Sequence, residues 1–185
     1  MINVNDFKTG VTIKFDDNIY QVLEFQHVKP GKGGAFVRSK LKNLRTKAII
    51  DHTFNAGIKV EAAHIEKTKM QFLYKDGVKY VFMNMDSFEQ IELDEELLKE
   101  EKGYLKEGLE VDIFFYEKEL LGINLPEKVL MKIISCESAV RGNTTNNAMK
   151  DALIETGINV KVPLFIEQGE IIVISTKDGK YSSRA

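Results

Sequence analysis

The sequence has a single cysteine, Cys136, among its 185 residues, and it contains only three histidines, three prolines and no tryptophan. One cysteine excludes an intrachain disulfide and fits a reducing compartment. No apolar run approaches the roughly 20 residues that a transmembrane helix needs, and the first residues lack the basic and apolar regions of a secretory signal. We therefore expect a cytoplasmic protein without a membrane partner.

Residue patterns that carry catalysis or bind metals are also missing. His27, His52 and His64 do not have the spacing of metal ligands. Cys136 lies in the apolar run KVLMKIISC, where we expect a buried small residue rather than a nucleophile. The segment Gly31-Lys32-Gly33 lacks the earlier glycine and the following serine or threonine of a phosphate-binding P-loop. We expect no enzyme active site, no metal and no cofactor.

Charge is distributed unevenly along the chain. The formal net charge is −2, but residues 1–64 carry +4, residues 65–127 carry −8 and residues 128–185 carry +2. A nearly neutral total therefore does not argue against a nucleic-acid partner. The charge break near residue 64 and the proline at 126 predict three units of about 60 residues each, and closing each sheet into a barrel would remove its exposed edges.

Short alternating segments separated by turn residues dominate the chain. We expect strands at residues 11–15, 19–28, 36–44, 48–54, 70–74, 78–83, 110–116, 129–136 and 169–176, with turns at Asp16-Asp17-Asn18, Asp76-Gly77 and Asp178-Gly179. Residues 94–105 alone predict a helix, because leucines lie among strong helix formers there. Pro163 indicates an edge strand. These patterns predict an all-β protein of small barrels.

The segment KPGKGGAF lies between two of the expected strands. Its distinctive residues are Lys29, Pro30, Gly31, Lys32, Gly33 and Gly34. The glycines leave no side-chain bulk beside Lys32 and can adopt backbone angles that are closed to other residues. The proline fixes its own φ and pushes the preceding residue towards extended geometry. We expect a thin hairpin tip with one projecting cationic side chain, able to enter a narrow space.

Basic residues continue beyond this tip. Between positions 29 and 47 there is no acidic residue, and the basic ones are Lys29, Lys32, Arg38, Lys40, Lys42, Arg45 and Lys47. The two-residue spacing of Arg38, Lys40 and Lys42 places them on one face of a strand. A basic strand face behind a cationic tip suits phosphate, so these three residues and Arg45 are RNA-binding candidates. A solvated strand face with a flexible tip is the alternative interpretation.

The last third of the chain offers further RNA-binding candidates. Gly142, Asn143 and Thr144 belong to a polar loop that has backbone and amide groups to offer. Tyr181 and Arg184 supply a ring for stacking and a guanidinium for phosphate. Small polar loops usually only connect strands, so a purely structural role stays open for each of these residues.

Together, these segments resemble bacterial translation elongation factor P. The matching motifs, in order, are KPGKGGAF (29–36), Arg38, KLKNL (40–44), TF-x-AG (53–57), YKDG (74–77), YVFM (80–83), LKEG (105–108), ETG (155–157), VKVPLF (160–165) and KDGKYSSR (177–184). They span nearly the whole chain, and their combination in this order is specific to the family. The motif GKGG alone would not be specific to it.

The resemblance implies a fold and a function. The fold would be an SH3-like (KOW-like) barrel at residues 1–64 and two OB-fold barrels at 65–127 and 128–185, in an elongated, tRNA-like monomer. The protein would bind the ribosome between the P and E sites, beside peptidyl-tRNA and ribosomal RNA. It would promote peptide-bond formation at stalled consecutive prolines. Lys32 would reach toward the tRNA CCA end and be the target of a lysine-modifying enzyme.

Two positions depart from the family pattern, and other functions remain open. Asn143 stands where the family usually has aspartate, and Asn55 stands where it usually has arginine. Whether Lys32 carries a β-lysyl group, an aminopentanol group or none is not decided by the sequence. The alternatives are a paralogue with a different stalling preference, a general RNA-binding module with the same fold, or, least favoured, a small enzyme.

Overall fold

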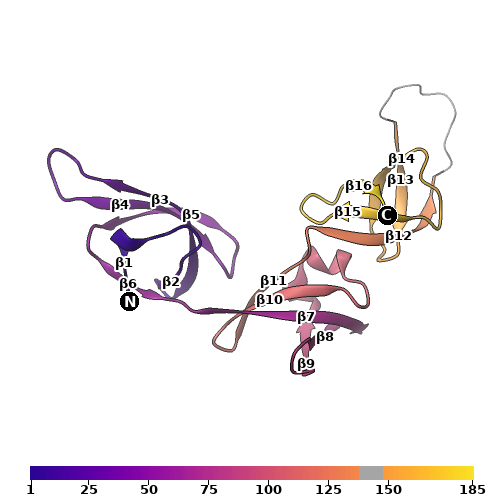
Figure 1. The fold of residues 1–185 in the computed structure, drawn as a ribbon, viewed down its shortest axis with the longest axis horizontal. Helices are drawn as coiled ribbons and strands as arrows, with labels where there is room; N and C mark the ends of the chain where they lie inside the picture. Colours follow the sequence, from indigo (N-terminus) through magenta and orange to yellow (C-terminus); the bar gives the residue numbers. More distant parts are fainter. Residues whose placement is uncertain (138–147) are drawn as a thin grey trace. The chain divides into compact units, whose positions relative to one another are not determined.

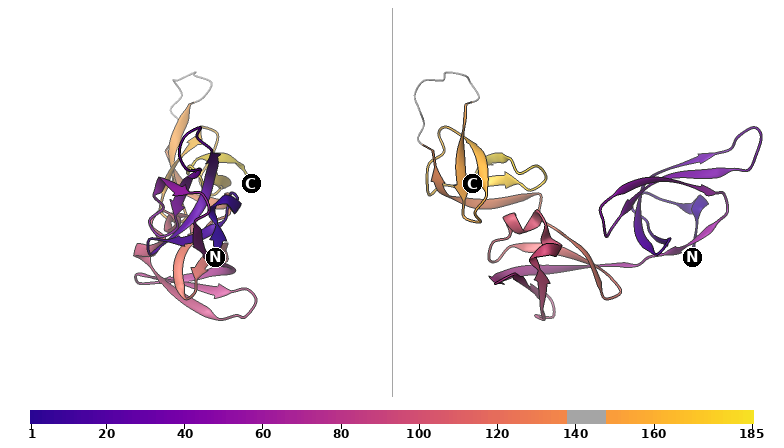
Figure 2. Two further views of the ribbon diagram at one scale, coloured as in Figure 1. Left: turned by 90° about the vertical axis from the view of Figure 1, so that its left-hand side faces the viewer. Right: turned by 180° about the vertical axis from the view of Figure 1, so that it is seen from behind.

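The structure, a computed structural model, describes residues 1–137 and 148–185. Strands in three antiparallel sheets dominate it, which confirms the all-β class that the sequence predicts (Figures 1 and 2). Contacts divide the chain into two compact units, Met1–Thr68 with Ile113–Gly122 and Lys69–Asp112 with Ile123–Ala185. In the described part of the chain, no helix has the length and apolar content that crossing a membrane requires.

The first unit is built on a six-stranded sheet in the order β1-β6-β2-β3-β4-β5. Its strands are β1 (Ile2–Asn3), β2 (Thr12–Phe15), β3 (Asn18–Val28), β4 (Phe36–Asn43), β5 (Ile49–Asn55) and β6 (Lys59–Ala62), with the 3-10 turn η1 (Val4–Asp6) after β1. The sheet curls around an apolar core that includes Ile13, Val37, Leu41 and Phe54, each at most 3% exposed (Figure 1). We call this curled sheet the N-terminal barrel.

The longest hairpin of this barrel joins β3 to β4. The two strands pair from Tyr20 with Asn43 to Val28 with Phe36, with one bulge between Val22 and Glu24. Their far end, with the tip between them, extends beyond the rest of the barrel (Figure 1). The predicted strands at residues 19–28 and 36–44 are therefore confirmed within one residue, because alternating β-rich segments on both sides of a Gly-Pro stretch are a reliable hairpin pattern.

The second sheet has the order β11-β10-β7-β8-β9. Its strands are β7 (Ile65–Asp76), β8 (Lys79–Asn84), β9 (Gln90–Asp94), β10 (Glu110–Tyr116) and β11 (Glu119–Asn124). The ring of Phe72 packs against the rings of Tyr80 and Phe82 in its core. The outer residues of the β10–β11 hairpin, Ile113–Gly122, belong to the first compact unit.

The third sheet, in the second unit, has the order β14-β13-β12-β15-β16. Its strands are β12 (Lys128–Cys136), β13 (Met149–Ile154), β14 (Asn159–Pro163), β15 (Ile171–Ser175) and β16 (Tyr181–Arg184). The core beneath it includes Met131, Ile154, Val162 and Ile172, all fully buried. Pro163 ends the edge strand β14, as predicted, because a residue without an N–H is tolerated there.

The predicted tight turns differ in detail. Asp16 and Asp17, with φ of 50° and 56°, form the two-residue loop between Phe15 and Asn18, as expected. In the next hairpin, however, Asp76 pairs with Lys79, so the loop is Gly77-Val78 rather than one centred on Asp76-Gly77. Only the glycine there has a positive φ, 59°.

The predicted helix at residues 94–105 is wrong as a continuous element. The structure has a single turn, α1 (Glu95–Leu98), then a break at Lys99 with φ of 38°, then the 3-10 turn η2 (Glu101–Tyr104). A helix this short is marginal alone, and its N-cap residue makes no side-chain capping bond. The positive φ of Lys99 interrupts the helix, and Gly103, which has low helix propensity, lies within the predicted range.

Candidate nucleic-acid interface

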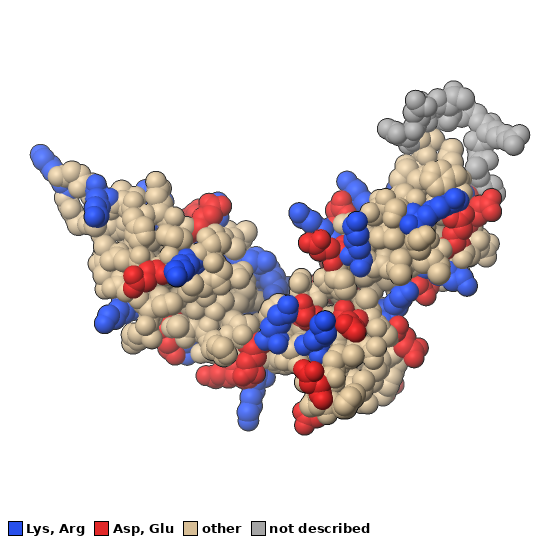
Figure 3. Space-filling view, viewed as in Figure 1, with Lys and Arg blue, Asp and Glu red and all other residues tan. Residues whose placement is uncertain are grey.

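The predicted hairpin tip lies between the end of β3 and the start of β4. Its residues Lys29, Pro30, Gly31, Lys32, Gly33 and Gly34 are all exposed. Figure 3 shows lysine or arginine atoms at the far end of this hairpin, surrounded by few other side chains. No hydrogen bond or ion pair links Lys32 to any residue in the described ranges. Its ammonium is therefore available to a partner.

The three glycines of the tip are not equivalent. Gly33 has a φ of 103°, which an L-amino acid with a side chain rarely adopts, so the fold itself requires glycine there. Gly31 and Gly34 do not have positive φ, and nothing lies within 4 Å of the place where their β-carbons would be. The free protein thus places no steric demand on these two positions.

The basic face of β4 forms as the spacing predicts. Val37, Ser39 and Leu41 alternate inward and are almost completely buried, while the residues between them face outward. The guanidinium of Arg38 lies 6.0 Å from the ring centre of Phe36. Lys40 forms an exposed ion pair of 3.5 Å with Glu24, whereas Lys42 has no ion pair among the described residues. Arg38, Lys40 and Lys42 thus share one strand face behind the tip.

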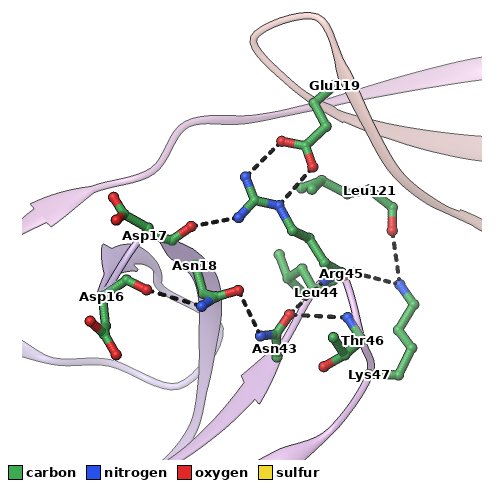
Figure 4. A network of polar contacts seen from close by, with 10 residues as sticks. All are labelled: Asp16, Asp17, Asn18, Asn43, Leu44, Arg45, Thr46, Lys47, Glu119 and Leu121. Carbon is green, nitrogen blue, oxygen red and sulfur yellow. Dashed lines mark hydrogen bonds and ion pairs between the residues drawn. The ribbon is translucent and has the colours of Figure 1, made fainter.

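Arg45 does not share this face. It lies in the turn after β4, where its Nε and Nη2 donate to the two carboxylate oxygens of Glu119 at 2.6 and 2.7 Å (Figure 4). Its Nη1 donates to the carbonyl oxygen of Asp17 at 2.6 Å. The guanidinium is therefore held by bidentate and backbone contacts within the protein.

The same turn is fixed by side chains around Arg45. The side-chain oxygen of Asn43 accepts from the backbone N–H groups of Arg45 and Thr46, at 2.8 and 3.1 Å (Figure 4). Lys47, whose φ is 65°, donates from Nζ to the carbonyl oxygens of Leu44 and Leu121 at 3.0 and 3.2 Å. These contacts hold the turn against the β10–β11 hairpin.

The contact between Arg45 and Glu119 shifts the pKa values of both side chains. The hydrogen bond from Arg45 lowers the pKa of Glu119 below its ordinary value of 4.5, although partial burial acts in the opposite direction. The same hydrogen bond raises the pKa of Arg45, which is charged in any case. Both groups are thus ionised at neutral pH.

The candidates in the last third are placed differently. Arg184 forms an ion pair with Glu170, Nε to Oε2 at 2.9 Å, and its guanidinium lies 4.9 Å from the ring centre of Phe165. Tyr181 is half-buried and packs against the core beneath the third sheet. Gly142, Asn143 and Thr144 lie outside the described residues. The second unit therefore offers a guanidinium that already has a partner and a ring that is only partly accessible.

Sequence reasoning missed the partners of these basic residues. Glu119 is 74 positions from Arg45, and no local pattern links them. Glu24 faces Lys40 across the β3–β4 ladder, which the hairpin register alone would have predicted. Of the basic residues that the sequence groups together, Lys29, Lys32, Arg38 and Lys42 have no ion pair in the described part of the chain.

Family comparisons cover nearly the whole chain. Residues 3–60 match the elongation factor P KOW-like domain, residues 65–123 the elongation factor P OB domain, and residues 129–184 the elongation factor P C-terminal domain. Proteins named elongation factor P from Phytoplasma australiense and from onion yellows phytoplasma (strain OY-M) are each 58% identical over 185 residues. These matches cover 100% of this chain and 98% of each relative.

Solved structures give the same fold. Eukaryotic translation initiation factor 5A from Methanococcus jannaschii superposes with a TM-score of 0.53 at 25% identity, over 67% of this chain and 93% of that one. A translation initiation factor of the same family from Naegleria fowleri gives 0.54 over 67% and 96%, and its 13% identity shows the fold alone. The all-β fold with KOW-like and OB domains is thereby confirmed. The chain belongs to the elongation factor P family of translation factors.

Proposed function

We propose that this protein binds the ribosome between the P and E sites, beside peptidyl-tRNA, and promotes peptide-bond formation where consecutive prolines stall translation. Membership of a translation-factor family makes the ribosome its partner. The observation that carries the finer proposal is the exposed tip, in which Lys32 projects without a partner in the described chain. In this proposal Lys32 reaches toward the CCA end of the P-site tRNA.

Positioning is sufficient for such a role. Proline is a constrained secondary amine, so its attack depends strongly on the orientation of the peptidyl-tRNA. Holding two reactants in the correct geometry can replace a large part of the entropic barrier without any acid or base from the factor. A thin tip with a lysine flanked by glycines can approach the phosphates of a tRNA end where a bulkier loop would be excluded.

The outward face of β4 is the proposed RNA contact behind the tip. Arg38, Lys40 and Lys42 share that face, and their only ionic partner among the described residues is the exposed Glu24. An exposed pair of this kind is weak and is easily exchanged for a phosphate. Tyr181, Arg184 and the loop with Gly142, Asn143 and Thr144 remain secondary candidates for contacts with tRNA or ribosomal RNA.

The remaining parts of the proposal concern organisation and modification. We propose functional domains at residues 1–64, 65–127 and 128–185, which agree with the extents of the three family matches. We also propose a cytoplasmic monomer whose Lys32 is the substrate of a lysine-modifying enzyme. Intact-mass measurement of protein from its native cell, with peptide mapping at Lys32, tests the modification and its chemistry together.

The function is tested by translation of two reporters that differ only in a Pro-Pro-Pro stretch. Lys32→Ala is expected to slow the proline reporter about tenfold while leaving the proline-free reporter unchanged, because orientation is lost without loss of the fold. Lys8→Ala is the matched control, since Lys8 is an exposed lysine of the same barrel and lies outside the proposed interface. Equal loss on both reporters, or no loss on either, would contradict the proposal.

The alternative, a general RNA-binding module, makes a different prediction. Such a module would bind unrelated RNAs with similar, salt-dependent affinity. Ribosomes carrying P-site tRNA should instead retain this protein selectively. A rescue of stalls other than consecutive prolines would indicate a paralogue with a different preference.

A further inference from the structure

The outer part of the β10–β11 hairpin packs directly onto the N-terminal barrel. Leu121, which is only 5% exposed, joins the fully buried Ile19 and the 5% exposed Ala63 in a small apolar cluster. Leu44, Ile65, Phe114 and Tyr116 pack around this cluster. The hairpin thus completes a core that the barrel alone would leave open to water.

Polar contacts surround the cluster on the side of the β4–β5 turn. The bidentate pair between Arg45 and Glu119 and the bond from Lys47 Nζ to the Leu121 carbonyl join the turn to the hairpin at three points (Figure 4). Arg45 also bonds the β2–β3 turn through Asp17. One guanidinium therefore ties two turns of the barrel to one hairpin.

The backbone is shaped to permit these contacts. A β-carbon at Gly122 would lie 2.6 Å from Lys47 Nζ, so a larger residue would push the ammonium away from the Leu121 carbonyl. Glu117, with φ of 57°, closes the hairpin turn just before Glu119. Lys47 itself has a positive φ, which directs the chain after Arg45 back into β5.

We propose that Arg45, Lys47 and Glu119 form a joint that locks the β10–β11 hairpin onto the N-terminal barrel, and that Arg45 and Lys47 are positioning residues for the Lys32 tip rather than RNA contacts. Three of the five N–H groups of Arg45 are already bonded to Glu119 and Asp17, so a phosphate would have to compete with a bidentate carboxylate for this guanidinium. The basic run that the sequence presents as one surface therefore divides in two. The basic residues up to Lys42 face outward, and Arg45 and Lys47 hold the barrel to the hairpin.

The functional half of this inference rests on the proposed function. A tip that orients a tRNA end must be carried by a rigid body, because a small misplacement removes most of the orientation effect. Barrel and hairpin become one such body only while the joint is closed. A loosened joint should leave the binding of RNA by the β4 face intact and reduce the rate of peptide-bond formation.

The joint is tested by exchanging its charges. Arg45→Glu and Glu119→Arg each place like charges opposite one another, and the combined variant restores an oppositely charged pair. Amide hydrogen exchange at residues 117–122 is expected to quicken about tenfold in each single variant and to return within about twofold of the parent in the combined one. Non-additivity of this sign is expected for two residues that are energetically coupled, as a direct ion pair is. Amide hydrogen exchange at residues 117–122 that stays fast in the combined variant would contradict the proposed joint.

The same variants on the proline reporter separate positioning from RNA contact. Each single variant is expected to slow the reporter about three- to tenfold and the combined variant to recover, with an unchanged salt dependence of ribosome binding. If Arg45 instead contacts a phosphate, the combined variant stays defective and the salt slope falls by about one. That result would overturn the positioning role.

A matched control comes from another exposed ion pair. Lys79 and Glu92, 2.7 Å apart in the second sheet, lie outside the joint and the proposed interface. Exchanging the charges of Lys79 and Glu92 should change neither the translation of the two reporters nor the hydrogen exchange at residues 117–122. If Lys32→Ala leaves the proline reporter unaffected, the proposed function fails while the hydrogen-exchange result still decides the joint.

Discussion

Individual basic residues differ in what faces them. The sequence places Lys32, Lys42 and Arg45 in one acid-free run, and nothing near them in the chain indicates which of them has an acidic partner. In the structure a carboxylate 74 positions away holds Arg45, whereas Lys32 and Lys42 have no ion pair among the described residues. Long-range pairing has no signature in a single sequence, which is why the role of Arg45 could not be derived from it.

The Arg45–Glu119 pair predicts a specific pH dependence. Because the pKa of Glu119 is lowered in the folded protein, the carboxylate stabilises the fold fully above its ordinary pKa of 4.5. This contribution is lost as the pH falls through the lowered folded-state pKa. Glu119→Gln should therefore reduce the free energy of unfolding at pH 7 and have little effect at the lowest pH at which the protein stays folded.

Chemical denaturation of the parent protein and of Glu119→Gln, from pH 7 down to the lowest pH at which the protein stays folded, measures this difference. The expected loss at pH 7 is about 1 kcal/mol or less, since the two side chains are 34% and 45% exposed and solvent screens the pair. A difference between the two proteins that does not shrink on acidification would show that the effect does not come from the charge of Glu119.

Among the secondary-structure elements, strands followed from the sequence and short helical turns did not. Alternation fixes which residues of β4 face the core, as the burial of Val37, Ser39 and Leu41 confirms. The strands β1, β6, β9, β11 and β13 were not predicted, since the preference for a strand depends strongly on the neighbouring strands. The continuous helix at residues 94–105 fails because the backbone turns at Lys99 and because Gly103 is a poor helix former.

The turn between β8 and β9 contains a strained residue. Phe88 has φ of 61°, an unfavourable value for a bulky side chain, and the residue is 69% exposed. Asn84 fixes this turn by accepting from the N–H groups of Asp86 and Ser87 through its side chain and of Phe88 through its backbone. Phe88→Gly should therefore raise the free energy of unfolding by about 0.5–1 kcal/mol.

Thermal or denaturant unfolding measures this change. Val78→Gly is the matched control, because Val78 is also a turn residue, 65% exposed, but has no positive φ. Glycine there adds only unfolded-state entropy and should lower stability. A loss of stability in Phe88→Gly comparable to the loss in Val78→Gly would show that the backbone of Phe88 is not strained.

Over the whole molecule, the distribution of charge fits a translation factor, whereas the net charge taken alone would argue against a nucleic-acid partner. A net charge of −2 conceals +4 in residues 1–64, where the tip and the β4 face lie. The motifs from KPGKGGAF to KDGKYSSR identify the family from the sequence alone, since their order is specific. What the sequence did not predict is that residues 113–122 of the middle hairpin complete the N-terminal unit. That association depends on Leu121 and Glu119 meeting residues far away in the chain.

The position of the tip on the ribosome is the central claim, and the single cysteine makes it directly measurable. Cys136→Ser removes the native thiol, and Gly34→Cys introduces one beside Lys32 at a position where the backbone and the open space allow a side chain. A hydroxyl-radical source attached there, on ribosomes stalled at Pro-Pro-Pro, should cleave the CCA end of the P-site tRNA. Cleavage no stronger than from the same probe at Lys8→Cys, or spread evenly over unrelated RNA, would contradict the account.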